Sequence, residues 1–147
     1  MENGSKKKKK TLNPQFSLYP PFPSYADGAH YDAHYDYFPP ETYGAQASQR
    51  LATVLVYLTD VPDEAGGETC FPLEGADGLA RRAAPGFSFK ACSGLVVGPP
   101  RAGDALLFYS QHANGTLDPQ SLHGGCPVER GVKVVATKWL RDRPHQF

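Results

Sequence analysis

Histidine and aspartate alternate in one short stretch of the chain, His30-Tyr31-Asp32-Ala33-His34-Tyr35-Asp36. Because alternate side chains of an extended strand share a face, we expect both histidines and both aspartates to point the same way. A histidine and an aspartate two residues apart can bind one metal ion, and a second histidine would complete a site with positions open for substrate and O2. The candidate for this second histidine is His123, in Ser-Leu-His-Gly-Gly-Cys-Pro. A His-x-Asp pair is common by chance, so a solvated strand is the alternative interpretation.

The elements that must position these ligands are expected to be short strands. The chain has 147 residues with 15 glycines and 14 prolines, a composition that favours turns over long helices. Apolar or alternating runs predict strands at residues 50–61, 95–98, 104–110 and 132–140, the first of them buried on both faces. With ligands on distant strands, the pattern predicts a mainly β fold, a double-stranded β-helix of the jelly-roll or cupin-like kind with few helices.

The last of these runs carries a lysine on an apolar face. Lys133 alternates in step with Val135, Thr137 and Trp139, so its ammonium is expected to point toward the apolar wall of the barrel. A buried ammonium needs an anion beside it. We therefore expect an anionic ligand near Lys133.

Length and charge set the limits of the chain's organisation. We expect one folded domain, residues 25–147, after a disordered segment, residues 1–24, that is first lysine-rich and then proline-rich. The formal net charge of +0 gives no electrostatic reason to expect nucleic acid or a membrane surface as a partner. No apolar run approaches the roughly 20 residues that a spanning helix needs, and no signal peptide follows the lysines. Three cysteines, Cys70, Cys92 and Cys126, allow at most one intramolecular disulfide and leave its pairing open.

Five segments of the chain carry a family pattern when they are read together: YADGAHYDAHYDYF at 25–38, QRLATVLVYLTD at 49–60, GGETCFP at 66–72, GDALLFYS at 103–110 and DPQSLHGGCPVERGVKVVATKWL at 118–140. In this order they resemble the catalytic domain of prolyl 4-hydroxylases, the Fe(II)- and 2-oxoglutarate-dependent dioxygenases, in a style closest to the plant and algal enzymes. The family's pattern places a tyrosine three residues before the ligating histidine and Tyr-Phe after the aspartate. Only His34-Tyr35-Asp36 fits both conditions.

The resemblance implies roles for nine residues. The metal ligands are His34, Asp36 and His123. The residues that would hold 2-oxoglutarate are Lys133, Tyr25 and Thr69. The residues that would contact the peptide substrate are Tyr31, Arg50 and Trp139. The resemblance leaves His30 and Asp32 beside the ligands or at the surface.

The implied activity is the 4-hydroxylation of peptidyl proline, of the procollagen or hydroxyproline-rich-protein type, coupled to oxidative decarboxylation of 2-oxoglutarate to succinate and CO2. Fe(II) and ascorbate are the implied cofactors, and a proline-rich peptide or protein is the implied partner. The resemblance points to the endoplasmic reticulum or secretory pathway, although this chain shows no signal or transmembrane segment. Because plant-like relatives carry cysteine at the positions of Cys92 and Cys126, these two are expected to pair in an oxidising compartment, leaving Cys70 free.

Two other interpretations stay open. The family's domain normally has a helical and strand portion ahead of Tyr25, so the chain looks N-terminally truncated and could be a catalytically weak or inactive peptide-binding remnant. Its uncovered apolar face would then favour association. Alternatively, His30 and His34, four residues apart, could bind zinc on a helix in a hydrolase-like site. The neighbouring Pro39-Pro40 argues against that helix.

Overall fold

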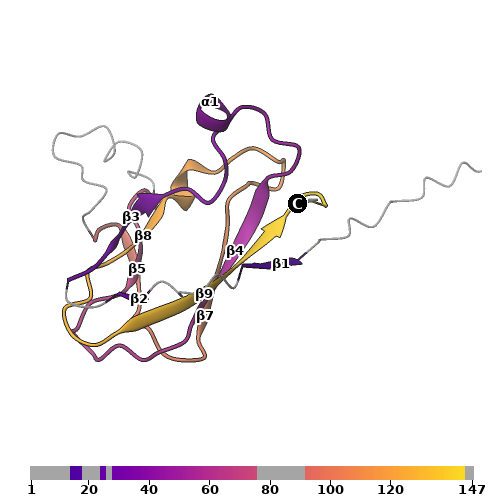
Figure 1. Cartoon of the computed structure of the whole chain (residues 1–147). Helices are drawn as coiled ribbons and strands as arrows, with labels where there is room; N and C mark the ends of the chain where they lie inside the picture. Colours follow the sequence, from indigo (N-terminus) through magenta and orange to yellow (C-terminus); the bar gives the residue numbers. More distant parts are fainter. Residues whose placement is uncertain (1–13, 18–23, 26–27, 76–91, 145–147) are drawn as a thin grey trace, which may run out of the picture.

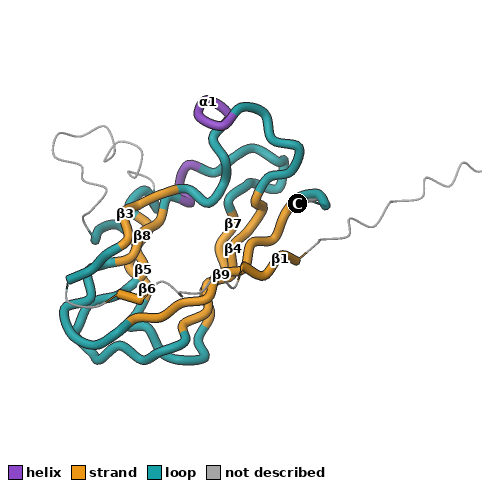
Figure 2. The backbone as a smooth tube through the Cα atoms, viewed as in Figure 1, coloured by secondary structure: helices purple, strands orange, loops and turns teal. Residues whose placement is uncertain are grey.

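The computed structural model describes residues 14–17, 24–25, 28–75 and 92–144, the first two segments as backbone only. Within these residues the strands form two antiparallel sheets that face each other (Figures 1 and 2). The first sheet runs in the order β1 (Pro14–Ser17), β9 (Lys133–Arg141), β4 (Arg50–Tyr57), β7 (Ala105–Tyr109), and β2 (Ser24–Tyr25) also pairs with β9. The second runs in the order β3 (Tyr31–His34), β8 (His123–Gly125), β5 (Thr69–Phe71), β6 (Leu95–Val97).

Helices contribute little to the described part of the chain. One turn of α-helix, α1 (Pro40–Tyr43), follows Pro39, and a 3-10 helix, η1 (Pro119–Ser121), leads into β8. Neither is long or apolar enough to cross a membrane. The mainly β, double-stranded β-helix expected from the sequence is confirmed.

The interior lies between the two sheets. Along β7, Leu106 and Phe108 turn inward while Leu107 and Tyr109 are exposed, the alternation expected for a strand with one buried face. Phe108 meets Phe71 of β5 edge to face, with ring centroids 5.2 Å apart. This aromatic contact joins the two sheets, and both rings lie beside the ring of His123.

Strand β4 fixes the geometry of the first sheet. Its Thr53 pairs with Phe108 of β7 on one side and with Trp139 of β9 on the other. Burial of β4 on both faces was expected, but Val54 and Val56 are only half-buried because they lie on the sheet face that points away from the interior.

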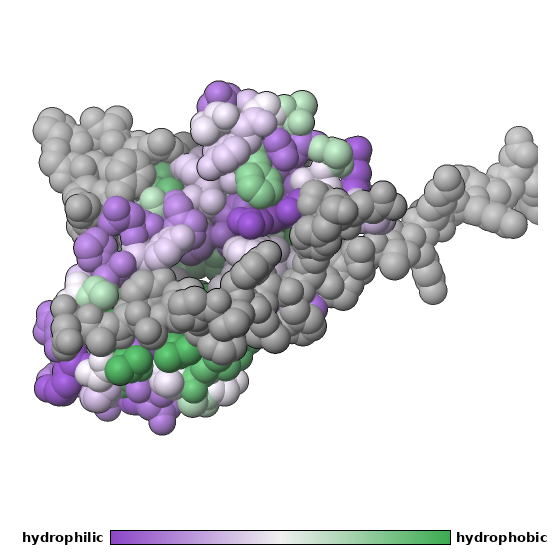
Figure 3. Space-filling model, in the orientation of Figure 1, coloured by the Kyte–Doolittle hydropathy of each residue, from purple (hydrophilic) through white to green (hydrophobic). Residues whose placement is uncertain are grey.

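Apolar side chains also reach the surface at one edge of the molecule (Figure 3).

The expected disordered segment, residues 1–24, needs a correction at Pro14–Ser17. These four residues form β1 and extend the first sheet by pairing with Thr137 to Leu140 of β9. A strand adds here because β9 is longer than its neighbours and offers unpaired backbone groups along its edge. Residues 1–13 and 18–23 lie outside the described part of the chain.

Candidate metal and cosubstrate site

Two histidines and one aspartate converge at the end of the second sheet. His34 closes β3, His123 opens β8, and the two residues are direct partners in the antiparallel pair. Asp36 follows β3 by two residues and lies between them: its carboxylate oxygens are 3.9 Å from His34 Nε2 and 3.8 Å from His123 Nε2. One potential ligand atom from each residue lies within 4.8 Å of the others, a spacing that suits a single ion.

Strand β3 does not keep the simple alternation that the sequence suggested. Tyr31 pairs with Gly125 and His34 with His123, so three steps along β3 match two steps along β8, the signature of a bulge. The extra residue separates the two His-x-Asp pairs. His30 and Asp32 bind each other at 3.0 Å near the surface and do not belong to the three-residue cluster.

Hydrogen bonds fix the tautomer of both histidines. Nδ1 of His34 is 2.9 Å from the carbonyl oxygen of Asp32, and Nδ1 of His123 is 3.0 Å from that of Ser121. Because a carbonyl oxygen only accepts, each Nδ1 carries the proton and each Nε2 presents a lone pair to the cluster. Burial lowers the pKa of His123 to about 4, against the raising effect of Asp36, so this imidazole is neutral near pH 7.

The Asp36 carboxylate is held from two sides. It is 4% exposed, and the Thr53 hydroxyl of β4 donates a hydrogen bond to Oδ2. Arg50, at the start of the same strand, donates from Nη1 to the Asp36 carbonyl oxygen at 3.2 Å and lies 3.8 Å from Oδ1. These contacts orient the carboxylate toward the two imidazoles, as partners of metal-binding carboxylates do.

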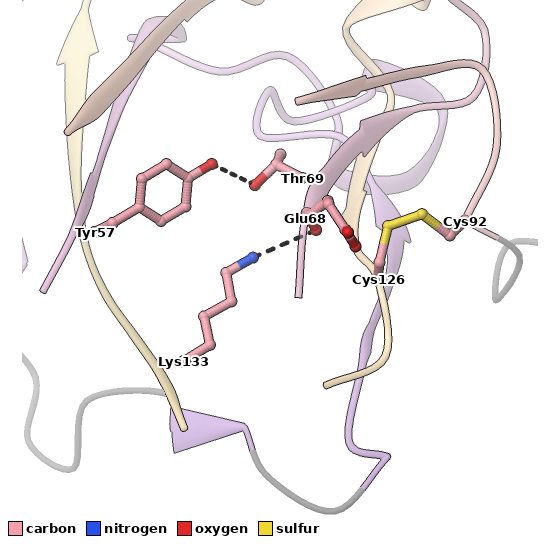
Figure 4. Close-up of a disulfide and its surroundings, with 6 residues drawn as sticks. All are labelled: Tyr57, Glu68, Thr69, Cys92, Cys126 and Lys133. Carbon is pink, nitrogen blue, oxygen red and sulfur yellow. Dashed lines mark hydrogen bonds between the residues drawn. A yellow bond between two sulfur atoms is a disulfide. The ribbon is translucent and has the colours of Figure 1, made fainter. Parts of the chain in front are cut away.

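A second group of polar side chains lies between the two sheets (Figure 4). Lys133 opens β9, is 4% exposed, and donates to the carbonyl oxygen of Glu68 at 3.4 Å. Nearby, the Tyr57 hydroxyl lies 2.8 Å from Thr69 Oγ1. Burial lowers the pKa of Lys133 to about 8, with Glu68 and Cys70 acting in the opposite direction. The interior face expected for Lys133 is the one observed.

The remaining candidates lie close to the same groups. The backbone of Tyr25, in β2, pairs with Lys133, and the Tyr25 side chain is outside the described part. The Tyr31 ring packs edge-on against His34 with centroids 4.5 Å apart. The Arg50 guanidinium carbon lies 3.7 Å from the centroid of Trp139.

Two buried hydrogen-bond donors at this end of the barrel are unused. Arg50 Nε and Trp139 Nε1 have no acceptor among the described residues. A buried donor without a partner costs free energy, so such atoms commonly await a ligand or water. Both lie on side chains expected to contact the substrate.

Sequence reasoning missed three contributors: Thr53, Tyr57 and Glu68. Thr53 and Tyr57 share the inner face of β4, where polar atoms interrupt an otherwise apolar run. That interruption was the available signal, since a buried hydroxyl needs a partner. Glu68 contributes its backbone carbonyl, which accepts from Lys133, and its carboxylate charge, which raises the pKa of that lysine. No side-chain pattern predicts the backbone contact.

The cysteine pairing expected from the resemblance is confirmed. Cys92 and Cys126 form a disulfide with Cα atoms 5.0 Å apart, and Cys70 is a buried free thiol (Figure 4 shows the bridge beside Glu68).

Comparison with known proteins agrees with this geometry. A family model described as the 2OG-Fe(II) oxygenase superfamily matches residues 16–141. The chain is 52% identical over 122 residues to the protein named Probable prolyl 4-hydroxylase 9 of Arabidopsis thaliana, and 47% identical over 121 residues to Prolyl 4-hydroxylase 13 of the same plant. These matches cover 83% and 82% of this chain but 40% and 42% of the relatives, so the chain spans less than half of their length.

Solved structures give the same relationship. The viral collagen prolyl hydroxylase of Paramecium bursaria Chlorella virus 1, in complex with 2OG, matches with a TM-score of 0.57 and 28% identity, covering 80% of this chain and 54% of that one. A truncated form of the viral enzyme matches with a TM-score of 0.58 and 26% identity, covering 89% and 57%.

Proposed function

The chain belongs to the 2OG-Fe(II) oxygenase superfamily, and we propose that it hydroxylates C4 of peptidyl proline while 2-oxoglutarate is converted to succinate and CO2. The observation that carries the proposal is the cluster of His34, Asp36 and His123 within 4.8 Å, at the same end of the barrel as Arg50 and Trp139. Prolyl hydroxylases among the similar proteins support peptidyl proline as the substrate class.

The three clustered residues would hold Fe(II). Both Nε2 lone pairs face the carboxylate, and the buried Asp36 would offset part of the ion's charge. Three protein ligands leave coordination positions for 2-oxoglutarate and O2, and bound iron supplies the O2 activation that no side chain here can perform.

The far carboxylate of 2-oxoglutarate would bind Lys133. Among the described residues this ammonium donates a hydrogen bond only to a backbone carbonyl, at 3.4 Å, so an incoming carboxylate improves its pairing. Thr69 offers a hydroxyl beside it. Burial raises the pKa of Tyr57, whose hydroxyl contacts Thr69, so the phenol keeps its proton near neutral pH. Tyr25 is the further candidate, since its backbone pairs with Lys133.

The peptide would lie across Tyr31, Arg50 and Trp139. An extended proline-rich strand offers carbonyl oxygens and flat rings, and the free donors Arg50 Nε and Trp139 Nε1 match those oxygens. The partly exposed Tyr31 ring beside His34 provides an apolar surface for the reacting proline. Holding the proline in place and excluding water are what these side chains contribute to the reaction.

Ascorbate is proposed as the reductant that returns oxidised iron to Fe(II). A hydroxyproline-rich or procollagen-like protein is the proposed natural substrate. The disulfide Cys92–Cys126 favours a secretory location, because oxidising compartments preserve such bridges.

The test is aerobic incubation of the protein with Fe(II), 2-oxoglutarate, ascorbate and a polyproline peptide. We expect the peptide to gain the mass of one oxygen atom per turnover, in step with succinate release. Succinate without hydroxylated peptide would contradict the assigned substrate. Iron binding without either product would support the inactive remnant, and activity that requires zinc would support the hydrolase-like alternative.

A further inference from the structure

The three cysteines gather on the second sheet, although no two are near in sequence. One ligand atom from each of Cys70, Cys92 and Cys126 lies within 4.8 Å of the others. Two of these sulfur atoms are joined as a disulfide, and the third is a thiol. A thiol next to a disulfide is the arrangement from which exchange proceeds.

The strand register places the sulfur atoms on the outer face. Thr69 points inward, because its hydroxyl meets Tyr57 of the other sheet, so the next residue, Cys70, points outward. Cys126 follows Gly125, whose missing side chain would meet the interior Lys133, and therefore also points outward.

Cys92 reaches this face from the opposite side of β5. It precedes β6, which is the neighbour of β5 away from β8, yet it is bonded to Cys126 just after β8. The segment from Cys92 to Gly94 must therefore cross over β5, and Gly94 lies tightly on the Phe71 carbonyl. Cys70 is only 3% exposed despite pointing outward, as expected if the bridge covers it.

We propose that Cys70, Cys92 and Cys126 form a thiol–disulfide exchange site in which Cys70 replaces Cys126 as the partner of Cys92. The Cys70 thiolate attacks Cys92 Sγ, and a Cys70–Cys92 bond forms as the Cys92–Cys126 bond breaks. The electron pair leaves on Cys126 Sγ, which takes up the proton that Cys70 released. The exchange itself is redox-neutral, and a small disulfide such as glutathione disulfide is the class of oxidant that would form either bridge from the reduced protein.

Strand geometry selects Cys92 as the cysteine that changes partner. Cys70 is opposite Gly124, two residues from Cys126, so the two cysteines are diagonal neighbours with Cα atoms about 7 to 8 Å apart. That separation lies at or just beyond the roughly 7 Å over which a disulfide can form without backbone movement, so a Cys70–Cys126 bridge is disfavoured. Cys92 lies outside the strands and can move toward Cys70 without disturbing the pairing of β5 with β8.

The exchange would change the surroundings of Lys133 in the proposed cosubstrate pocket. Cys70 lies within electrostatic range of the Lys133 ammonium, and it follows Thr69 directly. Gly125, which precedes Cys126, leaves the space that Lys133 Nζ occupies. Breaking the Cys92–Cys126 bridge removes a covalent restraint from the wall that faces Lys133.

The direct test uses the Cys126→Ser variant of the whole chain, oxidised with glutathione disulfide, quenched with acid and mapped by non-reducing peptide mass spectrometry. We expect a Cys70–Cys92 bridge. The matched Cys92→Ser variant should keep Cys70 and Cys126 unbridged, and Cys70→Val should keep only the original pair. Unbridged Cys70 in Cys126→Ser, with Cys92 carrying glutathione, would overturn the proposal, as would equally efficient bridging in Cys92→Ser.

The unmodified protein provides a second test that does not depend on how a variant folds. During incubation with an alkylating reagent at constant pH, a minor Cys70–Cys92 bridge should appear with Cys126 captured by the reagent. Its proportion should rise with incubation time, because each capture of Cys126 makes one exchange irreversible. Mapping that finds only Cys92–Cys126 at every time point would show that Cys70 does not exchange.

Discussion

His34 and His123 face each other as cross-strand partners at the end of the β3–β8 pair, with ring centroids 4.4 Å apart. The pairing arises from the bulge in β3, which brings His34 opposite His123. Each ring is turned by a hydrogen bond from Nδ1 to a carbonyl two residues back. The strand register and two local hydrogen bonds thus orient two of the three proposed metal ligands without a metal ion.

The Thr53→Val substitution should weaken iron binding without unfolding the protein. The replacement keeps the shape of the side chain and removes the hydrogen bond to Asp36 Oδ2, leaving the carboxylate less firmly oriented. We expect Fe(II) affinity to fall by about 10- to 100-fold, the usual cost of losing such a partner. Anaerobic metal titration measures this, with Thr116→Val in an exposed loop as the matched control. Equal affinity in both variants would remove Thr53 from the site.

Lys133→Ala should raise the 2-oxoglutarate concentration needed for activity far more than it changes the KM for peptide. The variant removes the buried cation proposed to bind the far carboxylate. Lys133→Arg should not restore the wild-type 2-oxoglutarate KM, because a guanidinium is larger than an ammonium and presents its donors in a fixed planar arrangement. Steady-state kinetics with each substrate varied in turn checks the prediction, and an unchanged 2-oxoglutarate KM in Lys133→Ala would refute it.

The affinity for 2-oxoglutarate should fall as the pH rises above about 8. Burial lowers the pKa of Lys133 to about 8, so the free protein loses its ammonium above that pH and must take up a proton to bind a carboxylate. Below that pH the ammonium is present and this dependence disappears. Each pH unit above 8 should weaken binding by at most about tenfold. Calorimetry across this range is the measurement, and Lys133→Gln should lack the effect.

Gly124→Ala should destabilise the protein and disturb the metal ligands. An added Cβ would lie 2.9 Å from the carbonyl oxygen of Tyr31 and 3.2 Å from the backbone of Ala33, so β3 would have to move. The cost should be about 1 to 3 kcal/mol, as for other overpacked sites. Gly125→Ala is the control, since its nearest contacts are 3.5 Å and 3.7 Å. Equal Tm values for the two variants would contradict this.

Some of the site could be anticipated from the sequence, and some could not. The interior position of Lys133 followed from alternation along one strand, and the choice of His34 over His30 followed from the family resemblance. The expected alternation of side chains between the two strand faces is broken between Tyr31 and His34, because one extra residue in a bulge changes which side chains share a face. Such a bulge leaves little trace in the composition of the strand.

Contacts between distant strands were harder still to foresee. Thr53 binds Asp36 because β4 of one sheet faces the turn after β3 of the other. Strand β1 was not expected, because the short segment Pro14–Ser17 gains its structure from pairing with β9 and has no strong strand pattern of its own. In both cases the structure depends on contacts between segments far apart in the sequence, which the local sequence does not reveal.

The most direct test of the central claim is an anaerobic Fe(II) titration of the unmodified protein, His34→Ala and His30→Ala. We predict one tightly bound Fe(II) per chain in the unmodified protein and in His30→Ala, and loss of tight binding in His34→Ala. The two histidines belong to adjacent His-x-Asp pairs and differ in whether they face Asp36 and His123, so the comparison isolates the geometry. Equal iron binding by both variants, or loss of binding in both, would contradict the assignment of His34, Asp36 and His123 as the ligands.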